Sequence, residues 1–253
     1  MRRPLIAGNW KLHKTVTEAV AFVGELRQKV GQVRDADILV CPTYPALHPV
    51  AKKLEGSNVA VGAQDLYFEE KGAFTGTVSA AMIKDAGCSH VLIAHSERRQ
   101  LFGETNETSN KRVRAALKAK LVPVLCVGET LAEREGGRTT DVIKAQLQGG
   151  LNGLAPAELS TLVIAYEPVW AIGTGKVATP AQAQEVHAMI RDWLRAAKDD
   201  ALANGCRILY GGSVKPDNAA ELLKLADVDG ALVGGACLEV DSFAAIVNAR
   251  KAG

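Results

Sequence analysis

The sequence predicts an α/β fold in which eight parallel strands close into a barrel inside a ring of helices. Eight short runs rich in Val, Ile, Leu and Ala recur along the 253 residues. The runs lack polar alternation, which is typical of parallel strands that are buried on both faces. Segments with helical periodicity separate the runs, and this strand–helix alternation favours a parallel sheet.

The predicted strands span eight ranges: residues 5–8, 37–41, 59–63, 90–94, 122–127, 162–166, 207–210 and 230–233. Eight β/α units can close into a (β/α)8 barrel. An open, doubly wound sheet is the alternative that the pattern leaves. The sequence shows no linker, low-complexity tract or shift in composition, so we expect one barrel domain over residues 1–253.

The helices between the strands have clear start signals. Thr15 opens an amphipathic segment over residues 15–32, and Glu18 completes the sequence of a capping box. Thr179 followed by Pro180 is an N-cap with proline at the first helical position. Two further helices are expected, over residues 105–120 and from about residue 241.

Composition argues against several classes of partner. The net charge of +2, the pI of about 8.2 and the 5% aromatic content do not suggest a nucleic-acid or membrane partner. The five cysteines are widely spaced and form no Cys-x-x-Cys pair, so we expect reduced, mostly buried thiols and no metal site. The N-terminal residues lack the pattern of a signal peptide, and we expect a cytoplasmic protein.

Polar residues that follow the strands are the candidates for chemistry, because parallel α/β folds bind ligands at the carboxyl ends of their strands. Asn9 and Lys11 follow the first strand, His95 the fourth and Glu167 the sixth. Burial would raise the pKa of Glu167 toward the range of a general base. Taken singly, Glu167 could equally be a paired structural carboxylate, His95 a core histidine and Lys11 a surface charge.

Two glycine turns follow the last two strands. Backbone N–H groups of Ser213, Gly234 and Gly235 can approach an anion closely, and a helical turn beginning at Gly235 would point its positive end at the same place. A phosphate site built by these two loops recurs in (β/α)8 barrels. Two ordinary tight turns are the alternative.

The segment after the sixth strand is predicted to be a hinged lid. It comprises nine residues: Pro168, Val169, Trp170, Ala171, Ile172, Gly173, Thr174, Gly175 and Lys176. The glycines allow changes of φ near its tip, and the capped helix at Thr179 anchors its end. Residues 173–178 also fit a dinucleotide-binding pattern, but they do not directly follow a strand, as that motif requires.

These motifs together resemble the triosephosphate isomerase family over the whole chain. The resemblance is carried by AGNWK (7–11), AHSERR (94–99), AYEPVWAIGTGK (165–176), YGGSVKPDN (210–218) and LVGGACL (232–238). It implies a TIM barrel and a cofactor-free, metal-free isomerase. Such an enzyme interconverts D-glyceraldehyde 3-phosphate and dihydroxyacetone phosphate through an enediol(ate), in glycolysis and gluconeogenesis.

The resemblance also implies a role for each candidate residue. Glu167 would be the base, His95 a neutral imidazole whose pKa is lowered by a following helix, and Lys11 and Asn9 would stabilise the enediolate; the neutral histidine is a well-known property of the family. The supporting residues would be Ser96 and Glu97, which orients Lys11. The phosphate would be held by N–H groups of Gly173, Ser213, Gly234 and Gly235.

The family is typically a homodimer in which a loop reaches the partner's active site. Here that loop is residues 64–79, and the expected interface residues are Gln64, Thr75, Gly76 and Arg98. His13, Asp65 and Thr77 depart from the family's usual Asn, Asn and Glu. The Glu usually pairs with the arginine at position 98, so we expect a weaker or differently wired dimer unless another carboxylate reaches Arg98.

Two other functions fit a phosphate-binding barrel. An aldolase with a Schiff-base lysine would need a lysine in or after a late strand, and none of the last four predicted strands offers one. A barrel that binds triose phosphates without turnover would need only the glycine turns. The combination of Asn9, Lys11, His95 and Glu167 therefore favours the isomerase.

Overall fold

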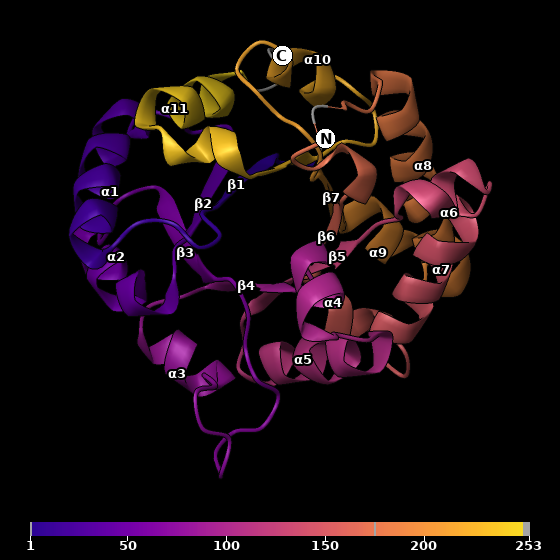
Figure 1. Cartoon of the computed structure of the whole chain (residues 1–253), viewed down its shortest axis with the longest axis horizontal. Helices are drawn as coiled ribbons and strands as arrows, with labels where there is room; N and C mark the ends of the chain where they lie inside the picture. The colour runs from indigo at the N-terminus through magenta and orange to yellow at the C-terminus, as the bar shows by residue number, and fades with distance from the viewer. Residues whose placement is uncertain (1, 175, 250–253) are drawn as a thin grey trace.

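In the computed structural model, which describes residues 2–174 and 176–249, eight parallel strands form a closed barrel (Figure 1). Their order around the barrel is the order of the sequence. The strands are β1 (Leu5–Asn9), β2 (Asp37–Cys41), β3 (Val59–Ala63), β4 (His90–Ile93), β5 (Val122–Val127), β6 (Val163–Tyr166), β7 (Arg207–Tyr210) and β8 (Gly230–Val233).

The pairing of the first and last strands decides between the two predicted architectures. β1 pairs with β8 in parallel, from Leu5 with Gly230 to Gly8 with Val233. An open sheet would leave both strands as edges, so the (β/α)8 barrel is confirmed and the doubly wound alternative is excluded.

Helices surround the strands (Figure 1). The α-helices are α1 (Val16–Val30), α2 (Leu47–Lys53), α3 (Ala80–Asp85), α4 (Ser96–Phe102), α5 (Asn106–Lys118), α6 (Leu131–Glu135), α7 (Thr139–Gly150), α8 (Pro180–Ala197), α9 (Asp200–Gly205), α10 (Ala219–Leu223) and α11 (Val240–Asn248). The 3-10 helices are η1 (Tyr44–Ala46), η2 (Pro156–Leu159), η3 (Val169–Ala171) and η4 (Gly235–Leu238).

Two apolar cores explain why the strand sequences lack polar alternation. Alternate residues such as Leu5 and Ala7 point into the barrel and pack against Leu92 and Leu209. Their neighbours, such as Ile6, pack outward against the helices. Both faces of the sheet are therefore buried, as the continuous apolar runs predicted.

The predicted local signals are observed where they were expected. Thr15 and Glu18 form a reciprocal capping box at α1, and Thr179 caps α8 in the same way. The strand boundaries agree within one residue, and one disagreement is informative. Ala94 lies outside β4 because its φ is +59°, the left-handed region that a residue with a side chain rarely adopts.

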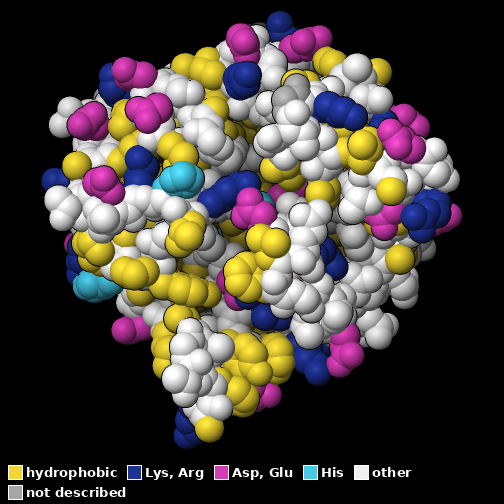
Figure 2. Space-filling model, viewed as in Figure 1, with side chains coloured by type: hydrophobic (Ala, Val, Ile, Leu, Met, Phe, Trp, Pro, Cys, Tyr) yellow, Lys and Arg dark blue, Asp and Glu magenta, His cyan; other side chains and the backbone are white. Residues whose placement is uncertain are grey.

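Residues 64–79 project from the barrel between β3 and α3 (Figure 1). Figure 2 shows hydrophobic side chains gathered on and beside this projection.

All five cysteines are buried and free, as expected. In the described ranges, no helix has the length and apolarity needed to cross a membrane.

Candidate active site

A pocket of about 390 Å³ lies at the carboxyl ends of the strands. Asn9 ends β1, and the other polar lining residues lie in segments that follow β1, β4, β6, β7 and β8. The pocket brings together eight of the residues expected from the sequence: Asn9, Lys11, His95, Glu167, Gly173, Ser213, Gly234 and Gly235. Their convergence follows from closing the barrel, because residues more than 200 positions apart then share one rim.

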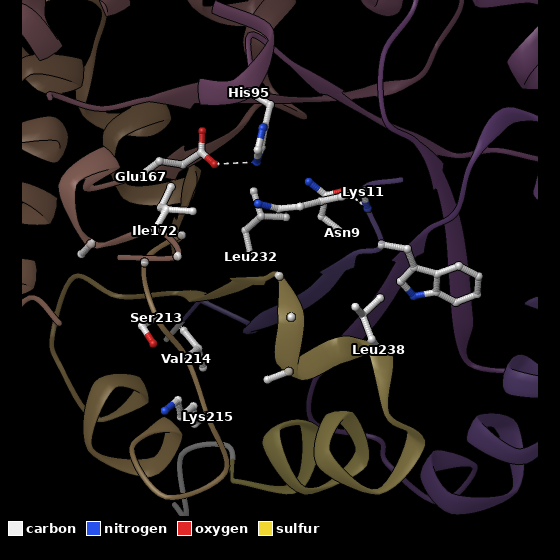
Figure 3. A pocket seen from close by; sticks show the side chains of 18 of the residues that line it. Asn9, Lys11, His95, Glu167, Ile172, Ser213, Val214, Lys215, Leu232 and Leu238 are labelled. Atoms are coloured by element: carbon white, nitrogen blue, oxygen red, sulfur yellow. Dashed lines mark hydrogen bonds and ion pairs between the residues drawn. The ribbon is translucent and has the colours of Figure 1, made fainter. Parts of the chain in front are cut away.

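Glu167 and His95 face each other in this pocket (Figure 3). Oε1 of Glu167 lies 2.9 Å from Nε2 of His95, and Oε2 accepts the backbone N–H of Ser96 at 2.9 Å. Both side chains are buried, at 2% and 6% residue exposure. Nδ1 of His95 accepts the N–H of Glu97 at 3.3 Å. This contact leaves the proton of a neutral ring on Nε2, where it is donated to Glu167.

The contacts of Glu167 correct the direction expected for its pKa. Burial raises the pKa, but the facing His95, the N–H of Ser96 and the charge of Lys11 outweigh burial and hold the pKa below its ordinary value. The expectation of a raised pKa was therefore wrong for this arrangement. It considered burial and missed the hydrogen-bond donors.

His95 shows the opposite balance. Burial lowers its pKa, but the carboxylate of Glu167 raises it more, and the net direction is upward. The predicted helix start is present, since His95 is the N-cap of α4, but it does not dominate the pKa. A ligand inserted between His95 and Glu167 would remove the contact that raises the pKa, while the N–H donated to Nδ1 would remain.

Lys11 is held at the pocket by contacts to its backbone and its ammonium. Its φ is +51°, and its N–H is donated to Oδ1 of Asn9 at 3.0 Å. Nε2 of Gln64 donates to its carbonyl oxygen at 2.8 Å. The ammonium pairs with Oε1 of Glu97, which is the orientation expected from the sequence. Lys11 thus points its charge toward the side of the pocket where His95 lies.

The glycine turns form the opposite side of the pocket. η4 begins at Gly235, as expected, and its first residues belong to the lining. A side-chain carbon on Gly235 would meet no atom within 4 Å, so its backbone is open to a ligand. Lys14 donates to the carbonyl of Leu238 at the end of η4, at 2.8 Å. The turn is thereby fixed to the segment that carries Lys11.

Comparison with known proteins places this arrangement in a family. A model of the triosephosphate isomerase family matches residues 4–250. This chain belongs to the triosephosphate isomerase family. The triosephosphate isomerase of Endomicrobium trichonymphae is 55% identical over 251 residues, covering 99% of this chain and 100% of that protein. The one from Trichlorobacter lovleyi is 56% identical over 248 residues, covering 98% and 99%.

A solved structure agrees with the sequence comparison. The crystal structure of triosephosphate isomerase from Bartonella henselae has a TM-score of 0.89 with this chain at 41% identity, and the match covers 98% of each chain. The fold and the enzyme class of the triosephosphate isomerase family therefore apply to this chain: it is an isomerase with a (β/α)8 barrel.

The predicted lid is attached to the barrel through Glu129. Trp170 in η3 donates its indole N–H to Oε1 of Glu129 at 2.9 Å, and Val169 donates its N–H to the carbonyl oxygen of Glu129 at 3.1 Å. Gly173, with φ of +69°, lines the pocket. Gly175, the other predicted hinge glycine, lies outside the described residues.

Two residues of the site were not singled out from the sequence. Glu129 follows β5 closely, so the rule that selected Glu167 after β6 would also have found it. Leu232 lies beside the Glu167–His95 pair, as does Ile172 of the predicted lid (Figure 3). No sequence signal distinguishes Leu232 from other apolar residues. Among residues 2–174 and 176–249, no three His, Cys, Asp or Glu side chains are grouped to hold a metal ion.

Three of the residues expected at a dimer interface lie in the projection, and the fourth, Arg98, lies on α4. Gln64 is at the base, and Thr75 and Gly76 are exposed at the tip. Arg98 pairs with Asp65 at 2.8 Å and also with Glu104. The charge of Arg98 is therefore compensated within its own chain, by two carboxylates that the sequence did not assign to it.

Proposed function

We propose that this member of the triosephosphate isomerase family interconverts D-glyceraldehyde 3-phosphate and dihydroxyacetone phosphate, with Glu167 as the base. The observation that carries this proposal is the facing pair of Glu167 and His95, with the ammonium of Lys11 in the same pocket. Binding alone would not need a buried carboxylate opposite an imidazole. The family's reaction is a step of glycolysis and gluconeogenesis.

The reaction is a proton transfer in two halves. The carboxylate of Glu167 takes a proton from the carbon next to the carbonyl. The electron pair of that C–H bond forms a carbon–carbon double bond, and the π pair of the carbonyl moves onto its oxygen to give the enediolate. The N–H on Nε2 of His95 is donated to this oxygen, and Lys11 balances its developing charge. Glu167 then returns the proton to the neighbouring carbon, while His95 passes a proton between the two oxygens.

The phosphate is bound on the glycine side of the pocket. N–H groups of Ser213, Gly234 and Gly235 supply donors, and the start of η4 adds positive potential. Gly173 brings a fourth N–H when the lid closes. Because the phosphate is bound on the side of the pocket opposite Glu167, the substrate carbons are presented to the base in one orientation.

Closure of residues 168–176 excludes water from the enediolate. An exposed enediolate would lose its phosphate, and expelling water prevents this side reaction and strengthens the charge interactions within the pocket. Glu97 and Ser96 support the site from α4: Glu97 through the ammonium of Lys11, and Ser96 through its N–H on Glu167.

The test is the interconversion of the two triose phosphates without added metal or cofactor. Glu167→Gln keeps the shape of the side chain and removes the base, so kcat should fall by roughly 10²- to 10⁴-fold. Glu185→Gln, at an exposed position of α8, is the matched control and should keep the native rate. A folded Glu167→Gln variant with native kcat would show that Glu167 does not carry the proton transfer.

The chain is also proposed to form a homodimer through the projection. Exposed hydrophobic side chains occur on and near this segment, including Phe74 (39%), Met82 (56%), Leu101 (74%) and Phe102 (66%). Exposed apolar groups of this size, gathered together, favour a protein interface. A second copy related by a two-fold axis would bury the same surface on both chains.

Sedimentation velocity from micromolar to nanomolar concentration tests the dimer and its strength. Leu101→Asp should shift the species toward monomer, whereas Val177→Asp, which changes an exposed apolar residue near the end of the lid, should not. Sedimentation as monomer at every concentration would refute the dimer. A dimer that persists in the nanomolar range would refute the expectation of a weakened interface.

We also propose that the chain forms a single domain and that it is cytoplasmic. A single domain over residues 1–253 is supported by the β1–β8 pairing, because the sheet is closed only when its first and last strands are both present. One cooperative unfolding transition with equal calorimetric and van't Hoff enthalpies would support the single domain.

The proposed cytoplasmic location is supported by five free buried thiols. Fractionation of the source cells tests it.

A further inference from the structure

We propose that Arg99 is a positioning residue for both reacting groups: it holds the backbone that aims His95, and it places a cation behind Glu167. This inference rests on the roles proposed above for His95 and Glu167. Arg99 lies on α4 and does not line the substrate pocket. Its effect would therefore reach the substrate only through other residues.

The first part of the proposal concerns Ala94. This residue has φ of +59°, a conformation that costs free energy in any residue with a side chain and persists only where its surroundings impose it. Nε of Arg99 donates to the carbonyl oxygen of Ala94 at 3.1 Å. The backbone N–H of Arg99 is donated to the carbonyl oxygen of His95, also at 3.1 Å. The side chain of Arg99 thus holds the peptide group just before His95, and its backbone N–H, together with that of Arg98, holds the peptide group just after it.

The guanidinium is itself fixed from the other side. NH1 of Arg99 donates to Oδ1 of Asn106 at 2.8 Å, and Nδ2 of Asn106 donates to the carbonyl of Ala145 in α7 at 3.2 Å. The planar guanidinium of Arg99 therefore joins the turn before α4 to the start of α5. A lysine ammonium, which is a point charge, could not reproduce both contacts at these angles.

The second part concerns a small cavity of about 140 Å³ behind Glu167. Arg99, Ser96, Cys126, Gly128 and Gln146 line it together with Glu167. NH2 of Arg99 is buried and has no hydrogen-bond partner among the described residues, so its donors are not used by any other described group. Arg99 and Glu167 thus share the lining of one cavity, and the charge of Glu167 acts on the guanidinium across it.

The charge of Arg99 is therefore available to Glu167. Burial lowers the pKa of Arg99, but arginine side chains keep their charge in proteins, so the cation persists. The titratable groups that face Glu167 or Arg99 from the surrounding elements are Lys11, His95, Glu104, Cys126 and Glu133. Burial raises the pKa of the Cys126 thiol well above its ordinary value, so that group is neutral and does not offset the cation.

The experiment compares kcat, KM and the pH profile of kcat/KM in four chains: native, Arg99→Lys, Arg99→Met and the control Arg114→Met. Arg114 is an exposed arginine of α5 that does not line the substrate pocket. Arg99→Lys should lower kcat roughly tenfold with little change in KM and should keep the native acid limb. Arg99→Met should lower kcat by about 10²-fold, as expected for a small misplacement of a reacting group.

Arg99→Met should also move the acid limb to higher pH, because loss of the cation raises the pKa of Glu167. Native kcat in a folded Arg99→Lys chain would overturn the positioning of His95, and an unmoved acid limb in Arg99→Met would overturn the electrostatic part. If Arg99→Met does not fold, as judged by circular dichroism, Arg99→Gln replaces it for the acid limb. A native chain without turnover would instead refute the proposed function.

Discussion

A side-chain carbon on Gly128 would lie 1.7 Å from the backbone carbonyl oxygen of Glu167. The end of β5 and the catalytic segment after β6 are thus in direct backbone contact, and the N–H of Glu167 is donated to Val127 at 2.8 Å. Glu167, the proposed base, is placed by main chain packed against main chain, with no room for a methyl group.

Gly128→Ala should therefore displace Glu167. We expect kcat to fall by about 10²-fold or more, because a shift near 1 Å is enough for such a loss. Overpacking should also lower the free energy of unfolding by about 3 kcal/mol. Steady-state kinetics and urea unfolding measure the two effects. Gly205→Ala, where a new carbon meets no atom within 4 Å, is the control, and equal behaviour of the two variants would contradict the prediction.

Lys11→Met should weaken both binding and turnover. The substitution keeps most of the apolar stem and removes the cation that pairs with Glu97 and that we propose to face the substrate oxygens. We expect kcat/KM to fall by roughly 10²- to 10³-fold, the usual effect of losing one donor aimed at a developing charge. Lys29→Met, on the outer surface of α1, should leave kcat/KM unchanged. If Lys11 had only a structural role, the Lys11→Met variant would lose activity only if it also lost its fold.

Glu129→Gln should loosen the first part of the lid. Oε1 of Glu129 accepts from Trp170 at 2.9 Å, from Arg134 at 3.0 Å and from the hydroxyl of Tyr166 at 3.1 Å, all at a fully buried site. An amide cannot hold the charge-assisted bonds, so the free energy of unfolding should fall by about 2 kcal/mol. Urea unfolding measures this loss. No loss relative to Glu133→Gln, which removes a charge from the partly buried cap of α6, would argue against the anchor.

His187 should make stability depend on pH in the acid range. Burial lowers its pKa to about 4, although the carbonyl of Asp227 opposes this. Between pH 6.5 and 4 the unfolded chain binds a proton at this histidine and the folded chain does not. Stability therefore falls as pH falls through this window, by about 1.4 kcal/mol per unit.

His187→Asn should accordingly give a shallower slope of unfolding free energy against pH than the native chain. His13→Asn, which changes an exposed histidine, should keep the native slope. Denaturant titrations at a series of pH values give both slopes. The slope is the decisive quantity, because the substitution itself can lower stability at every pH by leaving a cavity.

The positions of the strands and the main pocket residues could be predicted from sequence because both depend on local patterns. Continuous apolar runs mark strands buried on two faces, and the barrel brings the residue after each run to one rim. Glu167 and His95 could thus be expected in one pocket although they are 72 positions apart.

Contacts that cross between elements could not be predicted in this way. The N–H of Ser96 on Glu167 reverses the pKa direction expected from burial. The pairing of Arg98 with Asp65 and Glu104 depends on side chains from three separate segments, none of which has a local signal for the others. The left-handed Ala94 is likewise imposed by its surroundings and not by its own residue type.

The closed sheet has a consequence for synthesis of the chain on the ribosome. β8, which completes the sheet against β1, is translated after the seven other strands of the barrel, so no nascent chain without it can be this closed barrel. Until then β1 has an unpaired edge, the kind of edge that recruits other strands. The barrel therefore cannot close before β8 has been made, and the nascent chain exposes a strand edge until that point.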